Sequence, residues 1–178
     1  WHRYPERVCL VQVATNSKVY LIDTLAVDDM GPLGEVLADK TIVKVIQGAD
    51  YDIRCLDREW GFRVSNLFDT SIAARFAGMG QIGLSSLTEV LLGLDIPKNA
   101  RIQKGDWTLR PLSEVALNYA AMDVWHLLEI HQVLESRLRT LERSPWVAEE
   151  CARLEEVRYV APDPDTAFLS LKGSRRLS

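Results

Sequence analysis

The sequence lacks several features that would restrict its class. No apolar run approaches the ~20 residues that a helix needs to cross a bilayer. No basic-then-apolar leader, internal repeat or low-complexity stretch occurs, so we expect neither a membrane segment nor export. What is present is a chain of 178 residues, 47% hydrophobic and 26% charged, which is typical of a globular domain with a sizeable core.

Cysteine is scarce as well. Cys9, Cys55 and Cys151 are odd in number, far apart and not in any zinc-binding spacing. This pattern favours reduced, mostly buried thiols, and we expect a protein of the cytoplasm.

Positive charge is in short supply. The chain has 21 Lys and Arg against 25 Asp and Glu, a net charge of −4. A protein that binds nucleic acid by releasing counterions is usually basic, so this balance argues mildly against such a protein. It does not exclude an enzyme that holds phosphates through metal ions, because such a site must itself be acidic.

Apolar spacing and turn residues predict an alternation of strands and helices. Residues 8–14 and 19–22 are expected to form a hairpin, and residues 98–110 a polar loop. The other expected elements are strands at 41–46 and 64–68 and helices near 33–37, 49–60, 69–77, 84–92, 113–141, 146–157 and 165–171. This order is typical of an α/β fold, a mixed sheet flanked by helices.

The first candidate site consists of Tyr119 and Asp123. Four residues apart on a helix, their side chains share one face with apolar neighbours. A carboxylate at the edge of a buried stripe needs a partner or a metal ion, because burying a bare charge is costly. A partly exposed aspartate beside a core tyrosine would give the same spacing, so the pattern alone leaves both interpretations open.

A second candidate follows the buried strand at 41–46. Asp50 and Asp52 lie at a strand-to-helix junction, where open α/β sheets place ligand sites. Asp50 is the expected helix cap, and Asp52 is expected to point back over the sheet edge. Both could instead be caps that complement the helix dipole.

A third candidate is the loop at 103–112. Trp107 offers a face on which a base can stack, and Arg110 offers a cation. The loop could equally be a packed connection anchored by Trp107.

The order and spacing of these segments resemble the DEDDy 3′→5′ exonucleases, and within them ribonuclease D and its exosome-associated relatives. The matching stretches are Cys9-Leu-Val-Gln-Val-Ala-Thr15, Leu21-Ile-Asp-Thr24, Lys44-Val-Ile-Gln-Gly-Ala-Asp-Tyr-Asp-Ile53, Asn66-Leu-Phe-Asp-Thr70, Asp106-Trp-Thr-Leu-Arg-Pro-Leu112 and Tyr119-Ala-Ala-Met-Asp-Val124. The resemblance covers roughly residues 4–138. It implies a ribonuclease H-like fold, a mixed five-stranded sheet flanked by helices.

The resemblance also implies roles for single residues. Asp52 and Asp123 look like two metal-binding carboxylates, and Tyr119 looks like the tyrosine that orients the attacking water. The implied cofactor is a two-metal site holding Mg²⁺ or Mn²⁺, which suit carboxylate and water ligands.

The implied partner is RNA with a single-stranded 3′ end, and no membrane. We expect the strand to enter past Arg101, Lys104, Trp107 and Arg110, where cations meet phosphates and an aromatic ring stacks on a base. The expected activity is ribonuclease D-type hydrolysis from the 3′ end, in processing of transfer RNA or other structured RNA, by a monomer.

Two positions depart from the family pattern. The Asp-x-Glu motif of the family's opening strand is absent and should lie upstream of Trp1, while Asp23 matches a position on a later strand. Gln47 stands where the family commonly has His. With only Asp52 and Asp123 of the four carboxylates, we expect this segment alone to be inactive and the longer parent protein to be active.

The resemblance further implies a division of the chain. Residues 1–142 are expected to form the exonuclease domain, with its first strand truncated, and residues 143–178 a helical connector toward a C-terminal helical domain that binds nucleic acid. Two alternatives remain: a catalytically inactive module of the same fold that binds nucleic acid or protein, and a DNA 3′→5′ exonuclease. The residues before Trp1 would decide the first, and an RNA-against-DNA degradation assay the second.

Overall fold

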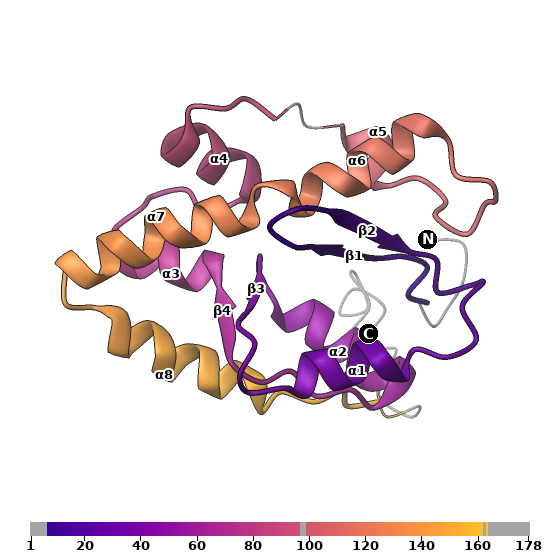
Figure 1. Ribbon diagram of the computed structural model, residues 1–178, viewed down its shortest axis with the longest axis horizontal. Helices are drawn as coiled ribbons and strands as arrows, with labels where there is room; N and C mark the ends of the chain where they lie inside the picture. The colour runs from indigo at the N-terminus through magenta and orange to yellow at the C-terminus, as the bar shows by residue number, and fades with distance from the viewer. Residues whose placement is uncertain (1–6, 97–98, 162, 164–178) are drawn as a thin grey trace, which may run out of the picture.

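Two short β-ladders form the sheet layer of the molecule (Figure 1). β1 (Val11–Ala14) and β2 (Val19–Ile22) pair antiparallel, as expected for a hairpin. β3 (Lys44–Ile46) and β4 (Leu67–Asp69) pair parallel, with Ile46 opposite Asp69. The computed structural model describes residues 7–96, 99–161 and 163, and within these the strands form two ladders instead of the expected five-stranded sheet.

Helices cover both ladders. They are α1 (Gly31–Ala38), α2 (Asp50–Trp60), α3 (Thr70–Phe76), α4 (Leu84–Leu92), α5 (Ala100–Gln103), α6 (Glu114–Trp125), α7 (Leu127–Thr140) and α8 (Ser144–Glu155). Two of the predicted helix ends are confirmed at glycines. Gly61 and Gly93 follow α2 and α4 with φ values of 67° and 69°, a left-handed conformation that other residues rarely adopt.

The single helix expected over 113–141 is wrong. It is two helices, α6 and α7, which meet at His126, where φ is −101° and ψ is 3°. The change of direction has a packing reason: α6 lies against the β1–β2 hairpin, whereas α7 packs on α3 and α4. The expected polar loop at 98–110 also contains a helix, α5, whose first turn is capped by the side chain of Asn99.

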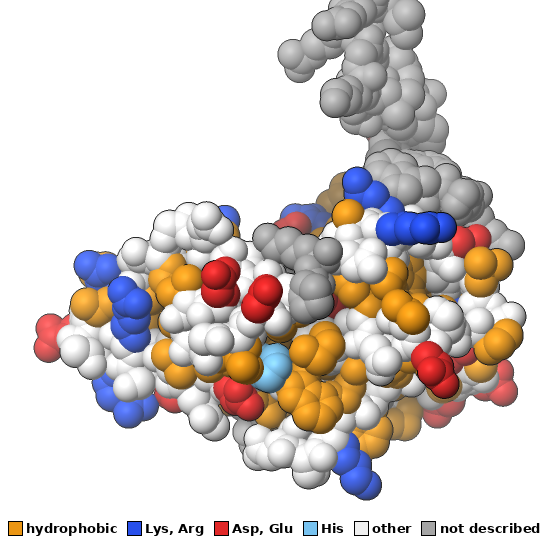
Figure 2. All heavy atoms as spheres, turned by 90° about the horizontal axis from the view of Figure 1, so that it is seen from above, with side chains coloured by type: hydrophobic (Ala, Val, Ile, Leu, Met, Phe, Trp, Pro, Cys, Tyr) orange, Lys and Arg blue, Asp and Glu red, His pale blue; other side chains and the backbone are white. Residues whose placement is uncertain are grey.

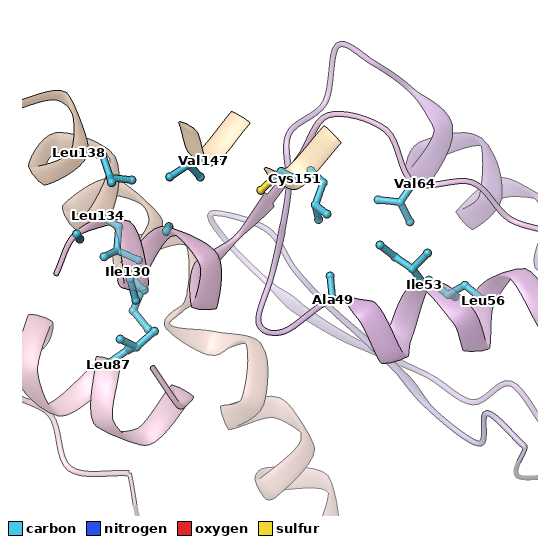
Figure 3. Close-up of a cluster of buried hydrophobic side chains, with 14 residues drawn as sticks. Ala49, Ile53, Leu56, Val64, Leu87, Ile130, Leu134, Leu138, Val147 and Cys151 are labelled. Atoms are coloured by element: carbon cyan, nitrogen blue, oxygen red, sulfur yellow. The ribbon is translucent and has the colours of Figure 1, made fainter. Parts of the chain in front are cut away.

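The core lies where α2, α3, α4, α7 and α8 converge. Figure 3 shows Leu87 of α4 beneath Ile130 and Leu134 of α7, and these three side chains are fully buried. Val147 and Cys151 of α8 belong to the same core cluster. The predicted boundary before residue 143 stays a prediction, but α8 packs on β4, α3 and α7. The short helix expected at 165–171 lies outside the described residues.

Within the described part of the chain, no helix combines the length and the apolar character needed to cross a membrane.

Replacement of Leu134 tests the assigned core. Leu134→Ala removes a fully buried side chain and should lower the free energy of unfolding by about 2–5 kcal/mol. Leu141→Ala, the same change at a position 40% exposed at the end of α7, is the control and should have a much smaller effect. Denaturant unfolding followed by circular dichroism measures both. Equal losses in the two variants would contradict the placement of α7.

Candidate active site

The three residues predicted to act together meet in one pocket. A cavity of about 300 Å³ is bounded by the segment around β1, by α2, by the α5 region and by α6. Asp52 enters it from α2, and Tyr119 and Asp123 enter it from α6. Asp52 and Tyr119, which lie 67 positions apart in the sequence, therefore share one site.

The β3–α2 junction places Asp52. β3 ends at Ile46, and the chain turns at Gly48, whose φ of 69° is a left-handed conformation that favours glycine. Helix α2 then begins, with Asp52 in its first turn. Both carboxyl ends of the parallel strands β3 and β4 lie at this edge, which brings Asp69 beside the junction.

The side chain of Asp69 accepts hydrogen bonds at the starts of two helices, α2 and α3. Its buried carboxylate accepts from the backbone N–H groups of Ser71 (2.7 Å) and Ile72 (3.3 Å), and so caps α3, the helix expected near 69–77. It also accepts from the N–H groups of Gly48 (3.2 Å) and Ala49 (2.7 Å), which open α2. The Ser71 hydroxyl donates a further bond of 2.7 Å.

The predicted cap of α2 is wrong. Asp50 makes no capping hydrogen bond, and the residue at the cap position is Ala49. The Asp50 carboxylate instead receives two hydrogen bonds of 3.0 Å from Arg54, one turn later on the exposed side of the helix. Because Asp69 already supplies acceptors to the start of α2, Asp50 is not needed there.

The electrostatics of the pocket disfavour bare negative charge. Surrounding protein atoms and the nearby Asp69 raise the pKa of Asp52 to about 6, although solvent still reaches its side chain through the open pocket. Burial also raises the pKa of Asp123. Burial and the Asp123 carboxylate raise the pKa of the Tyr119 hydroxyl. Among the described residues, no Lys or Arg forms an ion pair with Asp52 or Asp123.

Helix α6 begins as predicted. The Ser113 hydroxyl accepts from the N–H of Ala116 at 3.2 Å, which caps the helix that carries Tyr119 and Asp123. Trp107, in the loop before this helix, lies beside Tyr119 with ring centres 6.4 Å apart and planes inclined by 43°. The Trp107 ring N–H donates to the carbonyl of Gln103 at 3.4 Å.

Gln47, which stands where the resemblance leads one to expect His, uses both ends of its amide. Its Nε2 donates to the carbonyl of Ile82 at 2.9 Å, and its Oε1 accepts from the Thr70 hydroxyl at 2.6 Å. Gln47 therefore joins the end of β3 to α3 and to the loop before α4, without adding charge near Asp52.

The four predicted RNA contacts fall into different environments. Trp107 lines the pocket, while Arg101 and Lys104 are exposed on and just after α5. Arg110 does not line this pocket, because its guanidinium is bonded to Asp23 and to backbone carbonyls.

Sequence reasoning missed several residues that line the pocket. On α2, three further residues line the pocket at the spacing i, i+4, i+7: Tyr51, Cys55 and Arg58. That helical periodicity was available in the sequence and marks one face of a helix. The pocket is also lined by Gln103 and by the segment from Arg7 to Leu10, which no local sequence pattern indicated.

The donors present fit half of a divalent metal site. Asp52 and Asp123 offer carboxylate oxygens, which Mg²⁺ and Mn²⁺ prefer. Within the described residues, however, no group of three or more His, Cys, Asp and Glu side chains could hold a metal ion. Asp57-Arg58-Glu59 has the Asp-x-Glu spacing, but it lies in α2, and its Asp57 accepts from the N–H of Tyr159 and pairs with Arg63.

Basic side chains do not form a continuous surface on the face shown in Figure 2. Among the described residues drawn there, Lys and Arg stand singly or in small groups, with acidic side chains between them. This distribution agrees with the net charge of −4 and indicates that broad electrostatic attraction is not the means by which this face would hold a polyanion.

Comparison with known proteins finds nucleases among both the similar sequences and the similar structures. Ribonuclease D of Gluconacetobacter diazotrophicus is 42% identical over 167 residues, covering 93% of this chain and 42% of that protein. The crystal structure of Escherichia coli RNase D superposes with a TM-score of 0.79 at 30% identity, covering 91% of this chain and 43% of that one. Brucella melitensis NrnC, solved with bound Mg²⁺, superposes with a TM-score of 0.75 at 26% identity, covering 84% and 73%.

The chain spans less than half the length of the ribonuclease D proteins it matches. A family model described as 3′-5′ exonuclease matches residues 2–139, most of the chain. The fold expectation of a helix-flanked α/β exonuclease is confirmed by the superpositions. The chain therefore belongs to the 3′-5′ exonuclease family and is related to ribonuclease D and to the RRP6 catalytic core.

Proposed function

We propose that this chain carries half of the catalytic site of a 3′→5′ exoribonuclease. The observation that supports the proposal is the meeting of Asp52, Tyr119 and Asp123 in one pocket. Within the described part of the chain, neither carboxylate forms an ion pair with Lys or Arg, and the pKa of each is raised, as expected for ligands of an added cation. The family relation supports the reaction class.

In this proposal, the carboxylates of Asp52 and Asp123 hold divalent ions, Mg²⁺ or Mn²⁺, together with an Asp-x-Glu pair from the longer protein. When bound, such ions would supply activation of a water and stabilisation of the leaving 3′ oxygen. The Tyr119 hydroxyl, whose pKa is raised, stays protonated at neutral pH and can donate to or position that water. The Mg²⁺-bound Brucella melitensis nuclease supports the choice of metal.

The substrate we propose is a single-stranded RNA 3′ end, of transfer RNA or another structured RNA. Trp107 would stack on a base at the pocket, and the exposed Arg101 and Lys104, on and just after α5, would meet phosphates. Arg110 belongs to the same predicted set, but its N–H donors are already bonded within the chain. Escherichia coli RNase D, described as an exoribonuclease involved in structured RNA processing, and the pGG-bound Brucella melitensis nuclease support this choice. We further propose that the protein acts as a monomer in the cytoplasm.

An activity assay tests the proposal. In the longer parent protein with Mg²⁺, a 5′-labelled RNA should shorten one nucleotide at a time from its 3′ end, whereas this segment alone should leave it intact. Asp52→Asn, Asp123→Asn or Tyr119→Phe should each lower kcat by at least about 100-fold while RNA affinity changes little.

Asp50→Asn is the matched control, because Asp50 is two residues from Asp52 but outside the pocket, and it should keep full activity. A longer protein that degrades DNA and spares RNA would replace the proposed substrate. A longer protein that degrades neither would refute the enzyme.

The raised pKa of Asp52 predicts that the ionised side chain lowers the stability of the folded chain. Between the ordinary value of 3.8 and about 6, the folded chain binds more protons than the unfolded chain, so the stability associated with this group is lost as pH rises through 6. Asp52→Asn should therefore raise Tm at pH 8 without metal, and the gain should vanish below pH 4.

Asp50→Asn should behave in the opposite way. Hydrogen bonds from Arg54 lower the pKa of Asp50, so its contribution is present at neutral pH and is lost as pH falls. This variant should lower Tm slightly at pH 8 and match the unmodified chain at low pH. Thermal unfolding at both pH values measures the pair. A loss of stability in Asp52→Asn at pH 8 would contradict the assigned environment.

A further inference from the structure

Arg110 uses every N–H donor of its guanidinium within the chain. Nε donates to Asp23 Oδ2 at 2.6 Å, and Nη2 donates to Asp23 Oδ1 at 2.5 Å. Nη2 also donates to the carbonyl of Cys9 at 2.9 Å, and Nη1 donates to the carbonyls of Trp107 and Leu109 at 2.8 Å each. A guanidinium has five such donors, so none is left for a phosphate unless an existing bond breaks.

These bonds join three segments that are remote in the sequence. Cys9 precedes β1, Asp23 follows β2, and Trp107 lies in the loop before α6. Asp23 is itself oriented by the N–H of Leu25, which donates to its Oδ1 at 3.1 Å. The planar fork of arginine matches a carboxylate in a way that lysine cannot, so the arrangement depends on Arg at this position.

The loop that Arg110 holds carries a wall of the pocket. Trp107 is fixed through its carbonyl by Arg110 and through its ring N–H by the carbonyl of Gln103. Its ring lies against Tyr119, with centres 6.4 Å apart, and both rings line the pocket with Asp52 and Asp123. A shift of the loop would therefore move the surface on which the Tyr119 ring rests.

We propose that Asp23 and Arg110 are a pair of positioning residues, which fix Trp107 against Tyr119 and so hold the tyrosine hydroxyl in the catalytic pocket. The catalytic part of this inference rests on the proposed exonuclease function. It assigns a role to Asp23, which lies in one of the matching stretches but had no role from the sequence, and it replaces direct RNA binding by Arg110 with an indirect effect on the reacting site.

The first test uses this chain alone and does not depend on activity. Incorporation of 5-fluorotryptophan gives a resonance for Trp107, assigned by its loss in Trp107→Phe. Arg110→Lys, which keeps the charge but removes the fork, and Asp23→Asn, which keeps the shape, should each shift the Trp107 resonance. Arg54→Lys, in the similarly paired Asp50–Arg54 bridge on α2, should leave it unchanged. An unshifted Trp107 resonance in both folded variants would overturn the proposal.

The second test uses the active longer protein. Asp23→Asn and Arg110→Lys should each lower kcat by about 10- to 100-fold with KM nearly unchanged, because a small misplacement of a catalytic group has a large effect on rate. The double variant should be no slower than the slower single variant, since both remove the same arrangement. Arg54→Lys should keep the kcat of the unmodified protein.

Direct RNA binding by Arg110 predicts a different result. Arg110→Lys would then raise KM at constant kcat, and Asp23→Asn, which removes a negative charge, would tighten RNA binding. That outcome would overturn the proposal. An inactive unmodified protein would refute the proposed function, while the shift of the Trp107 resonance in this chain would still decide whether the pair positions the loop.

Discussion

The buried carboxylate of Asp69 is the constraint on which the candidate site depends. It accepts the N–H groups that open α2 and those that open α3, so the two helices start at fixed places beside the carboxyl ends of β3 and β4. A buried acceptor that loses its donors costs free energy, which makes this arrangement stable against rotation of either helix. Asp52 follows the first of these helix starts, and its position is a consequence of that arrangement.

The same arrangement makes the site costly for the folded chain. Asp69 lies close enough to Asp52 to raise its pKa, and burial acts in the same direction on Asp123. In the proposed function, a divalent ion bound by the two carboxylates would offset the cost of their desolvation. The proposed function would thereby reconcile a net charge of −4 with membership of a nuclease family. The attraction for phosphate would come through the metal ions and not from a basic surface.

Local chemistry made part of the structure predictable. Gly61 and Gly93 end helices, and Ser113 and Asp69 begin them, because these signals act within one turn of the chain. The second role of Asp69, at Ala49, was not predictable, because it joins positions 20 residues apart and depends on the pairing of β3 with β4. The prediction that Asp50 caps α2 was wrong for the same reason, because the acceptor at the start of α2 is Asp69, which the local sequence does not indicate.

The site shows the same difference between what local sequence predicts and what long-range contacts decide. Asp52, Tyr119 and Asp123 were placed by resemblance, and the pocket brings them together, whereas their spacing alone left a purely structural interpretation open. The break at His126 and the bonds of Arg110 to Asp23 and to the carbonyl of Cys9 arise from packing between remote segments. The most direct test of the account is a crystal structure of the longer protein with Mn²⁺, located by anomalous scattering. The account predicts Mn²⁺ in direct contact with carboxylate oxygens of both Asp52 and Asp123. A fully loaded site in which neither carboxylate contacts a metal ion would contradict it.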